Sequence, residues 1–136
     1  MYKRIFFNSK MFKIIEQINY WKQTAEDNLE TAEILISNNK YIEGLFFCHL
    51  SIEKILKALV VKEIGNVPPK SHNLIYLHEM AKVSISEEQR SFMAVLMKYQ
   101  LEGRYPEYYE PIPSFDIVKR YLNLTKELLL CLKKKL

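Results

Sequence analysis

The sequence predicts an all-α domain, an antiparallel four-helix up-and-down bundle with an additional short helix. Turn-forming residues are scarce, with Gly 3 and Pro 5 in 136 residues, whereas an all-β domain needs many of both for its turns. Apolar residues recur at three- and four-residue steps, which is typical of amphipathic helices. The length fits one domain, which can bury a core without a disulfide or a metal.

The first two predicted helices span residues 11–37 and 41–64. The first carries one apolar stripe, formed by Ile14, Ile18, Trp21, Ala25, Leu29, Ala32 and Ile36. The second is apolar around most of its circumference, which predicts a central place in the bundle. Asn38 and Asn39 separate the two helices, and Gly65, Pro68 and Pro69 end the second.

Three further signals complete the bundle. Ser71 is expected to cap a short helix over residues 72–82, and Ser86 is expected to begin a fourth helix. Residues 101–114 contain one glycine and three prolines, so we expect an irregular stretch there. A last helix is expected to begin near Phe115.

The bundle domain is expected over residues 13–136, preceded by a basic extension over residues 1–12, and either Met1 or Met11 fits as the start. The net charge is +4 and much of the basic excess lies at the two ends. Such ends favour solvated tails, although they permit an RNA or nucleotide partner. No apolar run is long enough for a membrane span or a signal peptide. Cys48 and Cys131 lie in apolar helical patterns, which indicates reduced thiols and a cytoplasmic protein.

Most catalytic and metal-binding signatures are absent from the sequence. It contains no glycine-rich phosphate loop, no paired cysteine motif and no Gly-x-Ser-x-Gly elbow. His72 and His78 are six residues apart, which places them about 240° apart on a helix. We therefore expect no metal and no cofactor.

His49, Glu53 and Lys57 form a polar row at four-residue spacing along the second helix. Residues at this spacing can bond to one another, with Glu53 between two potential cations. The row is either a structural seam that fixes helix register or a site that binds phosphate or holds a proton donor. The spacing alone favours the structural interpretation.

Arg104 and Tyr105 form the second candidate, because a guanidinium matches phosphate and an aromatic face stacks on a base. The structural alternative is that Arg104 pairs with a helix C-terminus while the tyrosines pack the loop. His72 is expected to bond to backbone or to a neighbouring side chain in a first helical turn. The alternative is an acid or base in a cleft with Arg104.

Four blocks in order resemble the HEPN family, the higher eukaryote and prokaryote nucleotide-binding domains. The first block is residues 25–33, AEDNLETAE, and the second runs from Tyr41 through FFCH at 46–49 to IEKILKAL at 52–59. The third contains Pro69, SHNL at 71–74 and Leu77, and the fourth is GRYP at 103–106. The resemblance extends from about Trp21 to Leu132.

The resemblance implies a helical bundle that pairs as a homodimer and acts with a minimal nucleotidyltransferase, in many cases as a toxin–antitoxin pair. Many members are metal-independent ribonucleases with an Arg-x(4–6)-His motif, but no arginine of this sequence is followed by histidine at that spacing. We therefore expect a nucleotide-binding or partner-binding module that does not contact a membrane. The candidate ligand-binding residues are Lys57, His72, Arg104 and Tyr105. One alternative is a ribonuclease with an atypical site, in which His72 is the acid or base and Arg104 the phosphate clamp. Another is an assembly subunit without a small-molecule site.

Overall fold

The computed structural model of the protein describes residues 2–101 and 104–136, with side chains from Ser9 onward outside the same gap. These residues are helical and contain no strand, which confirms the all-α prediction. In chain order the elements are α1 (Tyr2–Ser37), α2 (Tyr41–Ile64), α3 (Leu74–Ala81), α4 (Glu87–Met97), the 3-10 turn η1 (Pro106–Tyr108) and α5 (Phe115–Lys133). None of the helices in the described part of the chain is long and apolar enough to span a membrane.

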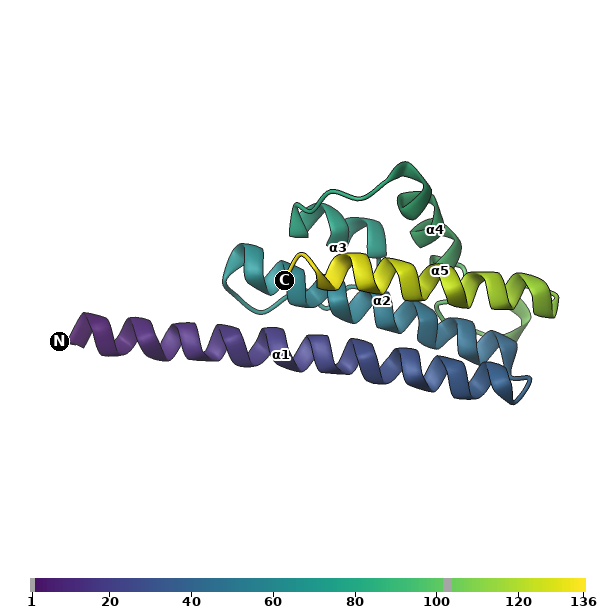
Figure 1. Cartoon of the computed structure of the whole chain (residues 1–136), viewed down its shortest axis with the longest axis horizontal. Helices are drawn as coiled ribbons and strands as arrows, with labels where there is room; N and C mark the ends of the chain where they lie inside the picture. The colour runs from purple at the N-terminus through teal and green to yellow at the C-terminus, as the bar shows by residue number, and fades with distance from the viewer. Residues whose placement is uncertain (1, 102–103) are drawn as a thin grey trace.

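α1 and α2 form a long antiparallel pair (Figure 1). Asn39 makes the turn between them in the left-handed conformation, at φ 63°, which asparagine tolerates better than most residues. The two helices approach closely at Gly44, where an added Cβ would lie 2.5 Å from Cγ1 of Ile36. α2 ends at Gly65, whose positive φ allows its N–H to bond to the carbonyl of Val61.

α5 lies against this pair and runs in the same direction as α2 (Figure 1). The rings of Tyr41 and Phe115 are 6.1 Å apart at the start of both helices. At the other end, Lys62 Nζ donates to the carbonyls of Lys135 and Leu136. α5 is therefore antiparallel to α1, and the ion pairs Lys126–Glu33 and Lys133–Glu26 join the two helices. This direction is possible because α3 and α4 lie between α2 and α5 in the chain, and α5 begins beside the start of α2.

α2 occupies the centre of the bundle, as its apolar circumference predicts, because α1, α3, α4 and α5 all pack against it. Leu45, Ile52, Ile55, Leu56 and Leu59 are almost completely buried within it. Burying a leucine or isoleucine side chain contributes about 1.5–3 kcal/mol. α3 and α4 cover the face of α2 that α1 leaves open (Figure 1).

Two predicted helix starts are wrong. α1 begins at Tyr2 rather than near residue 11, so one continuous helix crosses the predicted domain boundary at residue 12. α3 begins at Leu74 and is capped by Asn73, whose side chain accepts from the N–H of Tyr76. Ser71 instead accepts from the N–H of Asn73, and His72 therefore precedes the helix. Asn and Ser are both good N-caps, so composition did not decide between them.

The other predicted starts agree with the structure. Ser86 and Gln89 form a reciprocal capping box at the start of α4, and Ser114 caps α5. Cys48 is buried and Cys131 half-buried, and both are free thiols. Burial raises the pKa of Cys48 to about 12, despite a hydrogen bond with Thr125. Cys48 is therefore an unreactive part of the core.

Candidate functional site

α2 carries a buried polar row inside an otherwise apolar helix. His49 and Glu53 are 0 % exposed and Lys57 is 5 % exposed. The four-residue spacing places all three on one side of the helix. Because ionised side chains are costly to bury unless they are paired, the contacts of this row decide its role.

Glu53 is the centre of these contacts. Its Oε2 accepts hydrogen bonds from Lys57 Nζ at 3.1 Å and Lys54 Nζ at 3.2 Å. Its Oε1 is 2.8 Å from Nδ1 of His72. The predicted bond between Lys57 and Glu53 is therefore present, and Lys54 and His72 join it from outside the predicted row.

His49 does not bond to Glu53 as the row predicts, because its Nδ1 lies 4.0 Å from Oε1. Its other ring nitrogen, Nε2, is 3.0 Å from the carbonyl of His72. A carbonyl only accepts, so Nε2 carries the proton of the neutral ring. His49 thereby holds the backbone of the segment before α3 against α2, which brings the His72 side chain to Glu53.

Trp21 of α1 forms one wall of the site, which the sequence did not indicate. The Nζ atoms of Lys54 and Lys57 each lie 5.4 Å from its ring centroid. This is within the distance of a cation–π contact. The sequence did not distinguish this role of Trp21 from a place in the core, because Trp21 also belongs to the apolar stripe of α1. Trp21, His49, Glu53, Lys54, Lys57 and His72 are called the Glu53 cluster below.

Two buried polar atoms of the Glu53 cluster are unsatisfied by the described residues. They are Nε1 of Trp21 and Nδ1 of His49. Buried polar atoms are nearly always hydrogen-bonded, to the protein or to something bound. A seam with a purely structural role would be expected to satisfy its own members.

The electrostatics of the cluster favour an ionised Glu53 and a neutral His49. Burial alone would raise the pKa of Glu53, but the hydrogen bond from His72 and the charges of Lys54 and Lys57 outweigh it, so the pKa is lowered. Burial lowers the pKa of His49, and the nearby Glu53 opposes this only in part. Among the described residues, the ammonium groups of Lys54 and Lys57 both lie on this one carboxylate.

The other two candidate residues lie on the segment after α4. Arg104 donates from its guanidinium to the carbonyl of Lys98, 2.8 Å away, at the end of α4. This is the helix C-terminus contact of the structural alternative. Tyr105 is 69 % exposed. Within the described residues, neither side chain bonds to Glu53.

The accessible part of the cluster consists of the side chains around Glu53, not of Glu53 itself. The His72 side chain is 42 % exposed and that of Lys54 is 20 % exposed, whereas Glu53 is fully covered. Each ammonium group has three N–H donors and uses one on Oε2. The arrangement can therefore accept an anion from solvent. Within residues 2–101 and 104–136, no three His, Cys, Asp or Glu side chains are grouped to hold a metal ion.

One comparison with known proteins bears on the fold and another on the family. The crystal structure of TT1696 from Thermus thermophilus is similar, with a TM-score of 0.73 and 23% sequence identity, and the match covers 88% of this chain and 98% of that one. No curated protein matches the chain. The profile of the HEPN domain matches residues 18–136, which include the whole Glu53 cluster. The chain therefore belongs to the HEPN domain family.

Proposed function

We propose that the protein is a binding module that takes the phosphate groups of a nucleotide at the Glu53 cluster. The observation that carries this proposal is the convergence of Lys54, Lys57 and His72 on one buried carboxylate. A structural ion pair needs one cation for one anion, whereas this cluster holds two lysines. The two ammonium groups and their remaining N–H donors suit a phosphate oxygen.

Titration calorimetry with ATP, GTP and UTP tests the nucleotide part of the proposal. We expect at least one of them to bind with a dissociation constant below about 1 mM, or about −4 kcal/mol. Failure of all three to bind at that concentration would remove the nucleotide and leave partner binding. Trp21 is the only tryptophan of the sequence, so its fluorescence gives a second readout inside the site.

Lys54→Gln is the variant of choice, because Lys54 is partly exposed and its loss leaves Lys57 on Glu53. We expect it to weaken nucleotide binding by about tenfold, equivalent to about 1.4 kcal/mol. Lys119→Gln, on the exposed face of α5, is the matched control and should bind as the wild type does. Equal weakening by both variants would show that binding follows total charge rather than this site.

The partner part of the proposal is a homodimer that acts with a minimal nucleotidyltransferase in a toxin–antitoxin-like pair. Family membership supports it. A short nucleotidyltransferase reading frame beside this gene is the observation to seek. The two products should then co-purify, and Arg104→Ala and Tyr105→Ala test whether the segment after α4 contacts the partner. Separate elution of the two proteins would reject the pair.

A ribonuclease is the second candidate, favoured by the 2.8 Å contact between Glu53 and His72. A carboxylate on one ring nitrogen orients an imidazole and fixes its tautomer, which suits a general acid or base. Purified protein incubated with transfer RNA decides the matter. Cleavage that is lost in His72→Ala supports the enzyme, and absence of cleavage rejects it.

A further inference from the structure

The N-terminal end of α1 extends beyond the bundle (Figure 1). α1 has 36 residues and α2 has 24, so α1 is about 18 Å longer at 1.5 Å per residue. α2 ends beside Ile14, where Gly65 and Ile64 lie close to α1. Lys10 and Met11 line a small pocket with Ile64 and Gly65, and the turns of α1 before Lys10 extend beyond the end of α2 (Figure 1). We call residues 2–15 the arm.

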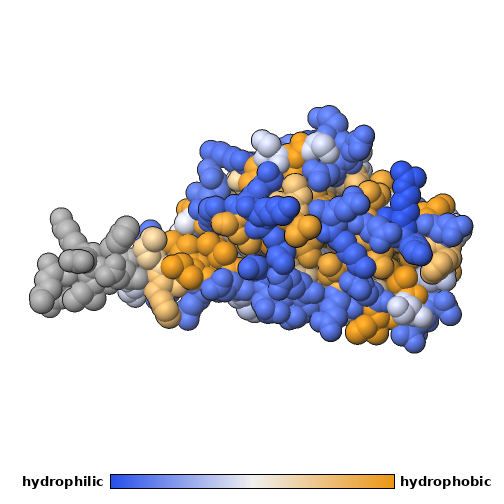
Figure 2. Space-filling view, in the orientation of Figure 1, coloured by the Kyte–Doolittle hydropathy of each residue, from blue (hydrophilic) through white to orange (hydrophobic). Residues whose placement is uncertain are grey.

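The described part of the arm is apolar on one side and basic beside it. Met11, Phe12 and Ile15 are 44 %, 63 % and 51 % exposed, and hydrophobic surface is visible where α1 leaves the bundle (Figure 2). Lys10 and Lys13 flank these residues. In the sequence, no acidic residue precedes Glu16. The described side chains of the arm thus offer exposed apolar groups flanked by lysines.

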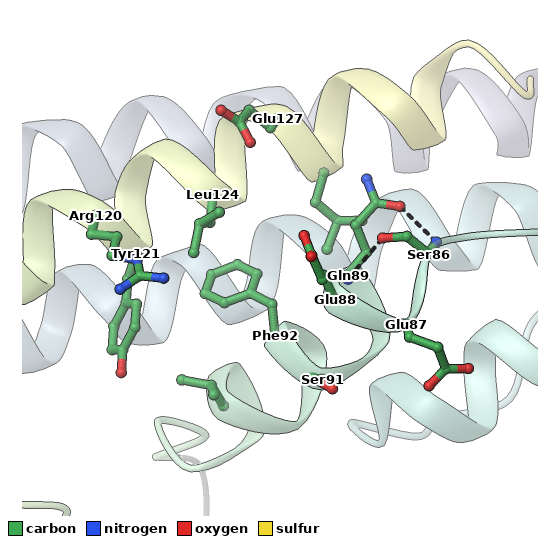
Figure 3. Close-up of a pocket in the computed structure, with 12 residues that line it drawn as sticks. Ser86, Glu87, Glu88, Gln89, Ser91, Phe92, Arg120, Tyr121, Leu124 and Glu127 are labelled. Atoms are coloured by element: carbon green, nitrogen blue, oxygen red, sulfur yellow. Dashed lines mark hydrogen bonds between the residues drawn. The ribbon is translucent and has the colours of Figure 1, made fainter.

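A groove between α4 and α5 has the complementary character. Its volume is about 800 Å³. Apolar side chains from both helices project into it, as Figure 3 shows for Phe92, Tyr121 and Leu124. A groove of this kind can receive the apolar side chains of one helix face.

The edge of the groove is acidic. Glu87, Glu88 and Glu127 line it, against a single basic residue, Arg120 (Figure 3). All three carboxylates are exposed, and none forms an ion pair within the described residues. The groove therefore suits a helix that is apolar on one side and flanked by lysines.

We propose that the groove of one copy receives the arm of a second copy, so that a dimer contains two reciprocal arm-in-groove contacts. Phe12 and Ile15 would pack on the floor of the groove, and Lys10 and Lys13 would pair with its carboxylates. The arm cannot enter the groove of its own chain, because it continues the straight helix α1 away from the bundle. This inference deepens the homodimer part of the proposed function and rests on it.

Like charges oppose two other pairings, the arm of one copy against the arm of the other and the groove of one copy against the groove of the other. Contact between two arms would bring the lysines of both copies together, and contact between two grooves would do the same with the glutamates. Like charges placed together across an interface cost several kcal/mol. Only the arm-in-groove pairing places opposite charges side by side at both contacts.

Charge reversal on each side tests the proposal by sedimentation. One variant is Lys10→Glu with Lys13→Glu, and the other is Glu88→Lys with Glu127→Lys. All four residues are exposed, so both variants should fold. We expect each variant alone to raise the dimer dissociation constant at least about tenfold. Mixed in equal amounts, the two variants should form a heterodimer, because every arm then meets a groove of opposite charge.

The control reverses two exposed carboxylates outside the groove, Glu30→Lys with Glu107→Lys, and should dimerise as the wild type does. A monomeric wild type would overturn the proposal. So would a groove variant that dimerises normally, because that result would show that Glu88 and Glu127 take no part in the interface. Nucleotide titrations followed by Trp21 fluorescence separate the two ideas, because both charge variants should keep the Glu53 cluster intact. Absence of nucleotide binding in the wild type and in every variant would reject the nucleotide site but would not bear on the proposed dimer interface.

Discussion

Glu53 is a fully buried carboxylate that three side chains from two segments share. Removing the charge in Glu53→Gln leaves Lys57 buried without a counter-ion, and breaking a buried ion pair in this way costs about 3 kcal/mol or more. We therefore expect the free energy of unfolding, measured by urea titration, to fall by about 3 kcal/mol.

Glu63→Gln is the matched control for this variant, because Glu63 forms an exposed ion pair with Lys82 at 3.8 Å. Exposed pairs contribute about 0–1 kcal/mol. If Glu53→Gln lowers the free energy of unfolding no more than Glu63→Gln does, the Glu53 cluster is neutral or well hydrated in solution.

His49 makes stability depend on pH in a defined window. Because burial holds its pKa below the usual 6.5, the unfolded chain binds a proton that the folded chain does not. The contribution of the neutral His49 ring to the free energy of unfolding is fully present above pH 6.5. It is lost as the pH falls toward the lowered pKa of His49. We expect the free energy of unfolding to decrease from pH 7 to pH 5, with a slope of at most about 1.4 kcal/mol per pH unit from this group.

His49→Gln should flatten this slope. Glu53 acts in a separate window with the same sign. Since its pKa is lowered from 4.5, its contribution is present above pH 4.5 and is lost below that value. Urea titrations at several pH values for each variant measure both windows. An unchanged slope in His49→Gln would contradict the assignment.

At the scale of the elements, α1 and α2 approach each other closely at Gly44. Alanine would improve the helix propensity of this position by about 1 kcal/mol. Its Cβ would however meet Ile36 Cγ1 at 2.5 Å, and overpacking costs about 1–3 kcal/mol. We expect Gly44→Ala to lower the free energy of unfolding by about 1 kcal/mol, despite the better propensity.

A double-mutant cycle identifies the cause of this loss. Ile36→Ala removes the atom that the new Cβ would meet, so Gly44→Ala should stabilise rather than destabilise in that background. Additive losses would show that the clash with Ile36 is not the cause. Thermal or urea unfolding of the four proteins of the cycle provides the measurement.

The whole molecule is organised around α2, and its stability should be distributed accordingly. α2 is surrounded by four helices, so its amides should exchange hydrogen only on global unfolding. The turns of α1 before Lys10 extend beyond the end of α2 (Figure 1) and should exchange by local fraying. Hydrogen exchange followed by mass spectrometry, on the Lys10→Glu, Lys13→Glu variant as a monomer, should show this difference. Equal protection of both segments in that monomer would contradict it.

Dimerisation should slow the exchange of the arm and leave that of α2 unchanged. The comparison between wild type and the groove variant Glu88→Lys, Glu127→Lys isolates this effect, because the arm is identical in the two proteins. The same data would also show whether α4 and α5 become protected on their facing sides, as the arm-in-groove contact requires.

The sequence by itself determined the helices and the polar row of α2, because apolar periodicity, caps and four-residue spacing are local properties. Tertiary structure alone decided which residues complete the Glu53 cluster. His72 reaches Glu53 from 19 residues away, and Trp21 arrives from a different helix. Their meeting depends on the path of the segment after α2 and on the rotation of α1 against it. Local spacing contains no information on either, so the sequence indicated the Lys57–Glu53 contact and His72 separately, without the bond that joins His72 to Glu53.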